Sequence, residues 1–529
     1  MRCSFDLLLA LLAAAAACKP VELAPAMVDA GADIATPTAA AAAGWRSQVL
    51  YLVIPDRFRD GDASNDSATH CFDRNNPQHF HGGDFEGLRQ NLGYVRDLGA
   101  TAIWITPPNL QAGPPGNACG YHGYWIDYSD PPDDALQPEL GSADDLAHLT
   151  SDMHASNMRF VLDMVVNHAG DTARLPRQHD DWFHDPATCG QLGPAEIYCP
   201  VDNHPDFKQE RADVAAYLSS LEARAVTRYG VDGIRMDTAK HVPASYFRTS
   251  FFPAVRGARS DLFAVAEIFE EGSTSTFVPY LDAGFDSAFH YPLYAAITNA
   301  IGKSGTVDQV AGAIADGIAR VGADRALDLV LFIDNHDVPR FANQPGFGVA
   351  EDEIRRRLLL ALDLMFTLPG IPQLYYGDEL GMYGGADPDN RRDLPAWATD
   401  PAGRAQPHPG SAVAGSALVY ARVQKLSGLR RNVSAFADGE YHELWRQNGA
   451  ANPNVYAFSR GTGSDIRIVV VSNGAAHSGM MHIPVHGIAD GTTLVDDLGD
   501  GAPGQVVITG GKLVADFPAH SAAIYRIAP

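Results

Sequence analysis

The segment GIRMD, from Gly233 to Asp237, is a short apolar run that ends on a carboxylate. Three other segments follow the same pattern, namely LDMVVNH at 162–168, FAVAE at 263–267 and LFIDNHD at 331–337. The acidic side chains of the four segments are Asp163, Asp237, Glu267 and Asp337. Strands that deliver acidic groups to one rim are typical of barrel enzymes, and paired carboxyl groups are typical of glycosidic hydrolysis. The four segments therefore predict both a barrel and a carboxyl-based reaction.

Eight short apolar runs recur along the chain, separated by stretches that are compatible with helices. They lie at residues 49–54, 102–106, 160–166, 233–237, 262–267, 285–289, 330–334 and 372–376. Runs without alternation, placed between helical patterns, indicate parallel strands that are covered on both faces. Eight such units predict an α/β fold, a (β/α)8 TIM barrel, in which active groups lie at the carboxyl ends of the strands. The four carboxylates fall at or just past those ends.

The remaining segments predict two additions to the barrel. Residues 169–205 are rich in Pro, Asp, His and Cys, and they are too long for a simple connection between strand and helix. They predict a small inserted domain B after the third strand, so that the barrel comprises residues 45–168 and 206–430. From 431 to 529, short segments joined by Gly, Asn and Asp turns predict a C-terminal antiparallel β-sandwich. Its predicted strands are ELWRQN, NVYAFSR, IRIVVVSN, MMHIPV, GQVVIT and SAAIYRI.

Residues 1–18 contain one basic residue, an apolar run and small residues, a pattern that resembles a secretory signal peptide. Residues 19–44 are rich in Ala, Pro, Thr and Asp and predict a flexible tether. Cys18 is either the lipidated cysteine of a bacterial lipoprotein or part of an ordinary signal peptide. We expect an exported protein, either secreted or held at the cell surface or outer membrane through Cys18.

The chain has 529 residues, of which 46% are hydrophobic and 19% are charged, and its formal net charge is −25. This composition predicts a globular protein with one large domain and smaller ones. The acidic balance disfavours nucleic acid and anionic membrane surfaces as partners, which leaves a lipid anchor as the expected membrane contact. It fits a neutral substrate or a hard cation, and it also fits a plain acidic surface. We expect a monomer.

Four cysteines lie in the predicted enzyme body: Cys71, Cys119, Cys189 and Cys199. An even number in an exported protein indicates two disulfides, for which three pairings are possible. We favour Cys189–Cys199, which closes a short loop, and this choice leaves Cys71–Cys119. Metal ligation is the competing interpretation, but no CxxC or Cys/His spacing supports it.

Side chains alternate along a strand, so Gly233, Arg235 and Asp237 share one face. In a barrel that face points inward, and Arg235 would keep Asp237 ionised by its charge. An ionised, held carboxylate suits a nucleophile, although an Arg–Asp pair can also be purely structural. Glu267 ends an apolar run, where burial raises a carboxyl pKa as a general acid requires. The competing role for Glu267 is a structural hydrogen bond to a neighbouring loop.

These motifs resemble those of the α-amylase family of glycoside hydrolases, family 13. DMVVNH, GIRMDTAKH, AEIF and FIDNHD occur in the family's order, and the likeness extends from Gln48 to the C-terminus. YLVIPDRF, GGDFEGL, TAIWITP, GYHGYW and PGIPQLYYGDE strengthen it. The resemblance implies hydrolysis of α-1,4-glucosidic bonds in starch and maltooligosaccharides by retaining double displacement. The alternatives are a cyclomaltodextrinase- or neopullulanase-like enzyme, a cyclodextrin glycosyltransferase-like enzyme, or a non-catalytic glucan-binding protein, which would usually lack one of the carboxylates.

By resemblance, Asp237 is the nucleophile, Glu267 is the general acid/base, and Asp337 is the third carboxylate, which stabilises the transition state. The two working carboxyl groups of a retaining enzyme lie roughly 5–5.5 Å apart. The resemblance also implies a set of substrate-binding residues: His122, Tyr124, Trp125, Asp163, His168, Arg235, Lys240, His241, His336, Asp387 and Arg391.

The signals for a subfamily are mixed. Lys240 and His241 resemble a pair that holds sugars after the cleaved bond in α-amylases and cyclodextrin glycosyltransferases. The segment GGADPDNRRDLPAW, which contains Asp387 and Arg391, is more similar to glycosyltransferases and cyclodextrin-degrading relatives than to fungal-type amylases.

The segment DGDASND at 60–66 places oxygen ligands at alternating positions, as Ca²⁺ prefers, although a solvated turn gives the same pattern. The resemblance implies a calcium site at this loop, with these ligands: Asp60, Asp62, Asn65, Asp66, the Gly82 carbonyl and Asp84. It implies a second calcium between the barrel and the inserted domain, held by Asn167, Asp206 and the His241 carbonyl. We therefore expect one or two Ca²⁺ ions.

Overall fold

The computed structural model describes residues 44–114, 119–446 and 454–529. The predicted signal peptide, Cys18 and all of the predicted tether except Gly44 lie outside the described residues. In the described part of the chain, no helix has both the length and the apolar character that crossing a membrane requires.

Within the described residues, eight parallel strands form one sheet in the order β6-β5-β4-β3-β2-β1-β8-β7. The strands are β1 Leu50–Val53, β2 Ala102–Ile105, β3 Arg159–Met164, β4 Gly233–Met236, β5 Phe263–Ala266, β6 Ser287–Ala288, β7 Val330–Leu331 and β8 Ile371–Tyr375. The two ends of this order, β6 and β7, meet through a bridge between Phe289 and Val330, so the barrel is nearly closed. The predicted (β/α)8 barrel is confirmed.

The barrel strands are buried on both faces, which explains their continuous apolar runs. Every residue of β1, β2, β4, β5 and β8 is buried. The runs predicted from the sequence overlap all eight strands, but some extend beyond the paired residues. The run 330–334 contains β7, which ends at Leu331, and Phe332 and Ile333 follow it as buried residues of the core.

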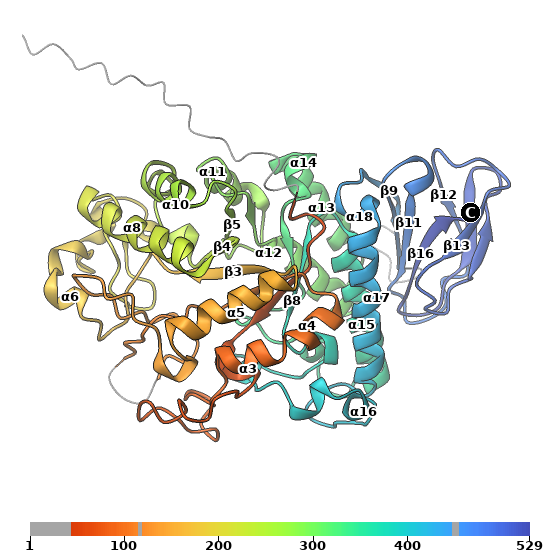
Figure 1. Cartoon of the computed structure of the whole chain (residues 1–529). Coiled ribbons are helices and arrows are strands. Elements are labelled where there is room, and N and C mark those ends of the chain that lie inside the picture. The colour runs from red at the N-terminus through yellow and green to blue at the C-terminus, as the bar shows by residue number, and fades with distance from the viewer. Residues whose placement is uncertain (1–43, 115–118, 447–453) are drawn as a thin grey trace, which may run out of the picture. The chain divides into compact units, whose positions relative to one another are not determined.

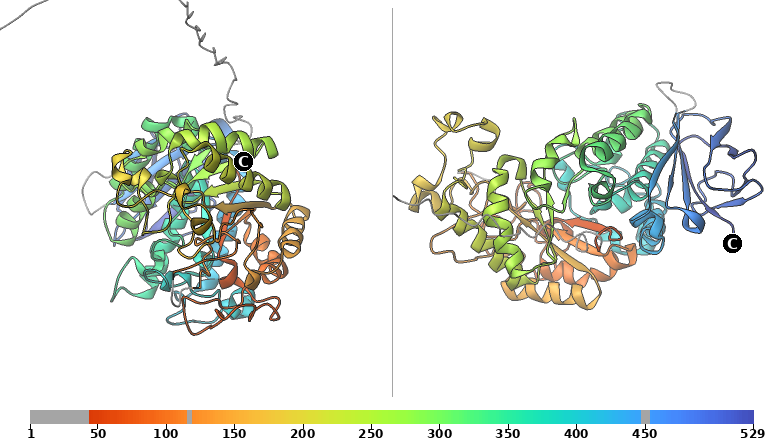
Figure 2. Two further views of the ribbon diagram at one scale, coloured as in Figure 1. Left: turned by 90° about the vertical axis from the view of Figure 1, so that its left-hand side faces the viewer. Right: turned by 90° about the horizontal axis from the view of Figure 1, so that it is seen from above.

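Helices surround the barrel sheet in Figure 1, and Figure 2 shows the same arrangement from two other directions. They are α2 Pro55–Phe58, α3 Phe85–Gln90, α4 Leu92–Leu98, α5 Ala143–Ala155, α8 Ala212–Tyr229, α9 Ala244–Tyr246, α10 Phe252–Ala258, α11 Val278–Leu281, α12 Tyr291–Ile297, α13 Asp308–Val321, α14 Ala323–Ala326, α15 Glu351–Thr367, α16 Pro401–Arg404, α17 Ser416–Asn432 and α18 Ser434–Ala437. Local signals set their ends. Ser142 and Asp145 form a capping box at the start of α5, and Gly230, in the left-handed conformation, ends α8.

The segment between β3 and α8 contains the residues of the predicted inserted domain. It has four short helical elements, α6 Leu175–Gln178, η2 Asp180–Trp182, η3 Cys189–Gln191 and α7 Ala195–Tyr198. Its two ends pair through a bridge between His168 and Asp206, and a second bridge joins Phe183, from the middle of the segment, to Phe207. These bridges bring the chain back to the barrel rim where it left.

Two disulfides occur among the described residues. Cys189–Cys199 closes a loop in the segment after β3, and Cys71–Cys119 joins two loops that precede β3. The favoured pairing is therefore confirmed.

The C-terminal residues form two antiparallel sheets. A six-stranded sheet has the order β14-β13-β16-β11-β10-β9, and β12 pairs with β15. The strands are β9 Tyr441–Arg446, β10 Val455–Arg460, β11 Arg467–Ser472, β12 Met480–Pro484, β13 Thr493–Asp496, β14 Gln505–Val507, β15 Lys512–Asp516 and β16 Ser521–Ile527. One hydrophobic cluster joins Val470 and Tyr525 of the larger sheet to Ile483 and Leu513 of the smaller one. Each of the six predicted segments overlaps one of these strands, and Gln447 and Asn448 of the segment ELWRQN lie outside the described residues. The strands β13 and β15 were not predicted.

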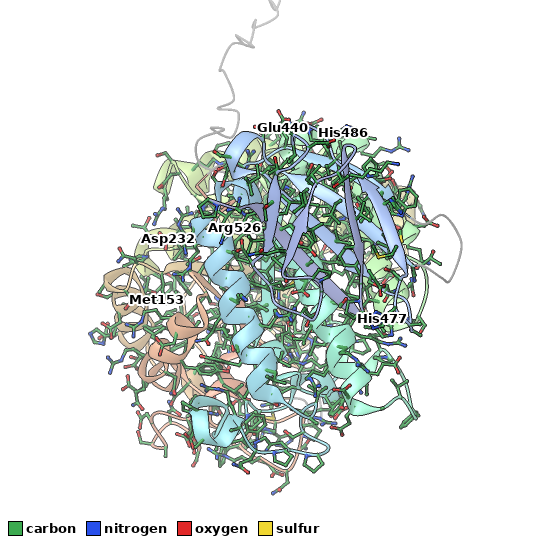
Figure 3. All side chains as sticks on the ribbon, turned by 90° about the vertical axis from the view of Figure 1, so that its right-hand side faces the viewer. Met153, Asp232, Glu440, His477, His486 and Arg526 are labelled. Atoms are coloured by element: carbon green, nitrogen blue, oxygen red, sulfur yellow. A yellow bond between two sulfur atoms is a disulfide. The ribbon has the colours of Figure 1, made fainter. Side chains whose placement is uncertain are left out.

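Asp232, labelled in Figure 3, precedes β4 and so lies at the amino end of the barrel strands. Its Oδ2 accepts a hydrogen bond from the Phe160 main-chain N–H at 2.7 Å and lies 2.8 Å from Nε2 of His154. Its Oδ1 pairs with Nη2 of Arg259 at 2.7 Å. This carboxylate therefore ties β3, β4, α5 and the segment before β5 together, at the end of β4 opposite to Asp237.

Asp232→Ala is expected to destabilise the protein by about 2 kcal/mol or more, because three partners lose a largely buried carboxylate. The midpoint of urea or thermal unfolding measures this. Asp261→Ala is the matched control, since Asp261 pairs with the same Arg259 at 3.0 Å but its side chain is 69% exposed. The control is expected to change stability by less than about 0.5 kcal/mol. Equal losses in the two variants would contradict the structural role of Asp232.

Candidate active site

One buried guanidinium brings the four carboxylates together at the carboxyl ends of the strands. Nη1 of Arg235 lies 2.6 Å from Oδ1 of Asp237 and 3.0 Å from Oδ1 of Asp163. Nη2 lies 2.9 Å from Oε1 of Glu267 and 3.8 Å from Oδ2 of Asp337. Arg235 is 1% exposed, so its charge is neutralised almost entirely by these groups.

The strand register produces this arrangement. Asp163 on β3 is the partner of Arg235 on β4. Parallel pairing continues past the strand ends, because the N–H of Asp237 donates to Met164 O and the N–H of Glu267 donates to Met236 O. The two acids that follow β4 and β5 are therefore held at the same level of the barrel.

Both carboxylate oxygens of Asp237 accept hydrogen bonds. Arg235 donates to Oδ1, and the hydroxyl of Thr238 donates to Oδ2 at 3.0 Å. Thr238 has a positive φ of 46°, a conformation that is strained for a β-branched residue. This turn directs the Thr238 main-chain N–H at Oε2 of Glu267, 2.6 Å away. One strained residue thus contacts both predicted working carboxyls.

Burial raises the pKa of Glu267 to about 8. The Arg235 charge acts in the opposite direction, and the charges of Asp237 and Asp337 raise the pKa further. Glu267 is buried, with 7% of its surface exposed. A carboxyl group with this pKa holds its proton at neutral pH, as a general acid must.

Asp163 lies deeper than the other three acids and is 1% exposed. It accepts hydrogen bonds from Nε1 of Trp104 at 3.0 Å and from the hydroxyl of Tyr124 at 2.8 Å. Burial raises the pKa of Asp163 to about 7. Its contacts place it behind the site, where it orients Arg235 and Tyr124.

Aromatic rings and imidazoles form the rim beside the carboxylates. The rings of Tyr124 and His336 stack at 5.3 Å, and the Tyr124 hydroxyl lies 2.6 Å from Nε2 of His336. His122 packs between Tyr124 and Trp125, and Nε2 of His168 lies 3.1 Å from the Tyr124 carbonyl oxygen. Burial lowers the pKa of His122, His168 and His336, so their imidazoles are neutral near pH 7.

The predicted residues on the two flanks of the site make the following contacts. Nζ of Lys240 donates to the Phe269 carbonyl at 2.9 Å and pairs with Glu196 at 3.1 Å. Nδ1 of His241 lies 2.8 Å from the Glu196 carbonyl, so the segment after β3 contacts this flank. On the other flank, Arg391 lies 3.6 Å from Asp337 and 3.2 Å from Asp387.

Four site residues were not predicted from the sequence: Trp104, Thr238, Tyr291 and Asn335. Thr238 and Asn335 lie inside the quoted motifs TAKH and FIDNHD, so the motifs could have identified them as site residues. Trp104 lies within the second predicted strand, and Tyr291 follows the sixth. Their contacts with Asp163 and Glu267 join neighbouring strands and have no signature in the local sequence.

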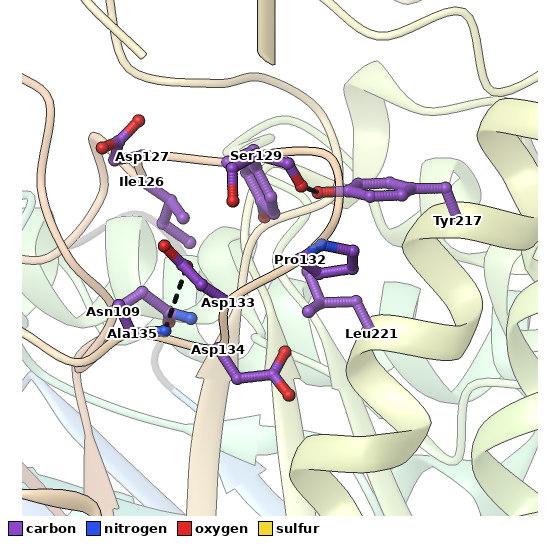
Figure 4. A pocket seen from close by; sticks show the side chains of 11 residues that line it. Asn109, Ile126, Asp127, Ser129, Pro132, Asp133, Asp134, Ala135, Tyr217 and Leu221 are labelled. Carbon is purple, nitrogen blue, oxygen red and sulfur yellow. Dashed lines mark hydrogen bonds between the residues drawn. The ribbon is translucent and has the colours of Figure 1, made fainter. Parts of the chain in front are cut away.

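A pocket on the outside of the barrel is separate from this site. It lies between the loop 126–135 and α8, where the hydroxyl of Tyr217 donates to the Ser129 carbonyl at 2.8 Å (Figure 4). None of the predicted site residues lines it. Two acids at its edge, Asp127 and Asp133, pair with Arg174.

The predicted loop ligands for calcium lie around Asp84. Its carboxylate accepts hydrogen bonds from the N–H groups of Gly61, Asp62 and Gly87 and from the Asn65 amide. Oδ1 of Asn65 and Oδ1 of Asp66 are buried and accept no hydrogen bond from the described residues. A Cβ at position 82 would come within 2.3 Å of Oδ1 of Asp66, which accounts for Gly82. Two unsatisfied buried oxygens fit a hard cation.

The remaining two loop ligands are engaged elsewhere. Asp60 pairs with Arg74 at 2.6 Å, and Asp62 is exposed and accepts from the Ser64 hydroxyl at 2.6 Å. The positive charge of Arg74 compensates the Asp60 carboxylate, which a bound cation would otherwise do. The loop therefore fits a cation through Asn65, Asp66 and Gly82 better than through Asp60 and Asp62.

The second predicted site brings three groups to one point. One terminal atom of the Asn167 amide lies 3.1 Å from the His241 carbonyl oxygen and 3.3 Å from Oδ1 of Asp206. An amide nitrogen there donates to both oxygens, whereas an amide oxygen completes a triangle of acceptors that a cation satisfies. No group of three His, Cys, Asp or Glu side chains among the described residues is arranged to hold a metal, so both predicted sites would need amide and main-chain oxygens as well as carboxylates.

A nearly closed (β/α)8 barrel with carboxyl groups gathered around an arginine at its rim defines an enzyme of the glycoside hydrolase class. The family model described as "Alpha amylase, catalytic domain" matches residues 52–408. The chain belongs to the α-amylase family.

Individual relatives agree with this assignment. A β/α-amylase of Paenibacillus polymyxa is 31% identical over 447 residues, which cover 81% of this chain and about a third, 34%, of that protein. Alpha-amylase 2 of Schwanniomyces occidentalis is 30% identical over 470 residues, covering 83% of this chain and 82% of the relative. The crystal structure of an Anoxybacillus α-amylase has a TM-score of 0.77 at 26% identity and covers 92% of this chain and 98% of that one. A cyclomaltodextrin glucanotransferase of Klebsiella oxytoca is 28% identical to this chain over 506 residues, 82% of this chain and 71% of that one.

Proposed function

We propose that the protein is an α-amylase-type enzyme that hydrolyses α-1,4-glucosidic bonds of starch and maltooligosaccharides with retention. The observation that carries the proposal is the shared contact of Asp237 and Glu267 with Arg235, at 2.6 and 2.9 Å. A common guanidinium keeps the two carboxyls close together, which supports the separation of about 5–5.5 Å that retention needs. The pKa of Glu267, raised to about 8 by burial, supports its role as the acid.

In the first step, Glu267 gives its proton to the glycosidic oxygen while a carboxylate oxygen of Asp237 attacks the anomeric carbon. The bond between that carbon and the glycosidic oxygen breaks, and the sugar on the acceptor side departs with a new hydroxyl group. In the second step, Glu267 takes a proton from water, whose oxygen attacks the same carbon and releases Asp237. Asp337 stabilises the positive charge that develops on the sugar ring in both steps.

The rim supplies sugar contacts on both sides of the cleaved bond. Tyr124 offers a ring face, and His122, His168 and His336 offer neutral imidazoles that hydrogen-bond to hydroxyl groups. Trp125 and Asp163 support these residues from behind. Asp387 and Arg391 hold the donor side, and Lys240 and His241 hold the acceptor side. We infer that the substrate is an α-glucan, and the net charge of −25 agrees with an uncharged ligand rather than nucleic acid.

A second candidate activity is glycosyl transfer to a sugar hydroxyl or cyclisation, in which the acceptor is a glucan instead of water. The similarity of GGADPDNRRDLPAW to such enzymes favours it, as does the cyclomaltodextrin glucanotransferase relative. A non-catalytic glucan-binding protein is disfavoured, because Asp237, Glu267 and Asp337 are all present.

We also propose that the protein is exported. The two disulfides support an oxidising compartment, because such bonds are rare in reducing ones. Lipidation of Cys18 would retain it at the cell surface or outer membrane, and its loss would give a secreted monomer.

We propose Ca²⁺ as a structural ion at two positions. Asn167, Asp206 and the His241 carbonyl would hold one ion, which would fasten the segment after β3 to the barrel rim. Asn65, Asp66, Asp84 and the Gly82 carbonyl would hold the other, with Asp60 and Asp62 at its edge. Bound calcium supplies positive charge to oxygens that lack other donors.

Asp237→Asn is expected to lower kcat on starch by about 10⁴-fold or more, because the amide cannot form the glycosyl ester. Reducing-sugar release measures this, and Asp261→Asn, at an exposed acid, is the control with unchanged kcat. Wild type is expected to yield linear maltooligosaccharides that are first released as the α-anomer. Cyclic dextrins as the main product would support transfer instead. Turnover that survives in Asp237→Asn would remove Asp237 from its role.

The pH profile tests Glu267. Since its pKa is raised to about 8, the proton of the acid is present below that pH and is lost above it. We expect kcat/KM on starch to fall as pH rises through about 8. Glu267→Gln is expected to abolish this alkaline limb together with most of the activity on starch. Aryl maltosides with good leaving groups need less proton donation, so their cleavage by the variant should fall less.

Removal of calcium with EDTA is expected to lower the melting temperature, because an ion at 100 times its Kd stabilises the folded state by about 2.7 kcal/mol. Calorimetric titration of the stripped protein with Ca²⁺ counts the sites. Asn167→Ala should remove one site and Asp66→Ala the other. Absence of Ca²⁺ binding, together with an unchanged melting temperature in EDTA, would contradict the proposal.

A further inference from the structure

Tyr291 lies beside the predicted acid and has no part in the reaction as described above. It follows β6, begins α12 and is 1% exposed. Its hydroxyl oxygen lies 3.4 Å from Oε1 of Glu267 and 3.3 Å from Nδ2 of Asn335. The tyrosine therefore bridges a residue that follows β5 to a residue that follows β7.

The direction of these hydrogen bonds is fixed by the main chain. Oδ1 of Asn335 accepts from the N–H of Asp337 at 2.8 Å, so the other end of the amide, Nδ2, faces Tyr291. An amide nitrogen only donates, which makes the Tyr291 oxygen an acceptor on that side. The tyrosine's own proton is then free to point at Oε1 of Glu267. A directed chain runs from Asp337 N–H through Asn335 and Tyr291 to Glu267.

The ring of Tyr291 is held in one position by its neighbours. It packs at 4.5 Å from Phe269, at 4.9 Å from Phe332 and at 6.2 Å from Tyr294, measured between ring centroids. A hydroxyl on a ring held from three sides loses little additional entropy when it forms a hydrogen bond. The geometry therefore favours a standing contact with Glu267 over a transient one.

We propose that Tyr291 is a positioning residue for Glu267, whose hydroxyl, oriented by Asn335, links the Asp337 loop to the acid/base. This inference rests on the proposed function of Glu267. Double displacement needs this carboxyl group as an acid in the first step and as a base in the second. A donor aimed at Oε1 favours the charged form that acts as the base.

Other groups also face Glu267, and they shift its pKa in both directions. Arg235 on β4 lies 2.9 Å from Oε1 and the Thr238 N–H lies 2.6 Å from Oε2, while Asp237 and Asp337 bring negative charge. Burial and the two acids raise the pKa of Glu267, and Arg235 and Thr238 oppose them. The Tyr291 hydroxyl lowers the pKa of Glu267, as Arg235 and Thr238 do. Without its hydroxyl, the pKa of Glu267 rises further.

Tyr291→Phe tests the inference, because it removes the hydroxyl and keeps the ring. The alkaline limb of kcat/KM on a maltooligosaccharide is expected to move up by about 0.5 to 1 pH unit. At pH 7, kcat is expected to fall about three- to tenfold with KM changed less than about twofold, because a carboxyl group with a higher pKa is a weaker proton donor in the first step. A merely structural role would lower activity at every pH without moving the limb.

Tyr294→Phe is the matched control. Tyr294 lies in the same helix and is 5% exposed, and its ring stacks on Phe332 at 5.0 Å, whereas the hydroxyl beside Glu267 is that of Tyr291. The alkaline limb of kcat/KM should not move in Tyr294→Phe. The unfolding midpoints of both variants should stay near that of wild type. Asn335→Ala should shift the limb in the same direction, and adding it to Tyr291→Phe should produce no further shift, since one chain is broken in both.

The outcomes separate this inference from the proposed function. Loss of starch hydrolysis in Glu267→Gln, with an unmoved limb in Tyr291→Phe, would overturn the role of Tyr291 and leave the function standing. A limb that moves to lower pH in Tyr291→Phe would also overturn it. If wild type lacks starch hydrolysis altogether, the proposed function fails first.

Discussion

The buried guanidinium of Arg235 is the interaction on which the rest of the site depends. A charge that is 1% exposed requires compensation inside the protein, and four carboxyl groups from four strand ends provide it. Arg391 adds a second positive charge, 3.6 Å from Asp337. Burial raises the pKa of Glu267 to about 8 and that of Asp163 to about 7, and the Arg235 charge opposes the shift of both groups. The same arginine therefore gathers the acids and limits how far burial raises the pKa of these two.

The barrel was predictable because its strands are buried on both faces. Such strands are apolar at consecutive positions instead of alternate ones, and the sequence shows eight of these runs. Strand limits were less predictable. Phe332 and Ile333 are as apolar as β7 but lie beyond the last paired residue, Leu331. The C-terminal sheets gave the weakest signal. β13 reads TLVD and β15 reads KLVAD, and each is too short and too polar on one face to stand out from a turn.

The four carboxylates were found through motifs at strand ends, and in the structure they meet around Arg235. What the sequence did not reveal are the partners that set their chemistry. Trp104 holds Asp163 from the neighbouring strand, and Tyr291 reaches Glu267 from the start of a helix. Such contacts join residues that are far apart in the chain, so no local pattern records them. The proposed calcium site between the barrel and the segment after β3 shows the same limit, because its fit depends on the Asn167 amide and the His241 carbonyl and not on a spacing of acids.

The incomplete closure of the barrel gives the tyrosine its importance. β6 and β7 are two-residue strands, and a bridge from Phe289 to Val330 joins them. Main-chain pairing holds Asp237 and Glu267 in register, because β4 and β5 form a full ladder. The loop that carries Asp337 follows β7, on the far side of the seam, where this ladder does not continue. The hydrogen bond between Asn335 and Tyr291 crosses the seam at the level of the carboxylates. A side-chain link therefore connects the loop of the third acid to the site, as main-chain pairing connects the first two acids. The link ends on Glu267, the carboxyl group that loses and regains its proton in the proposed mechanism.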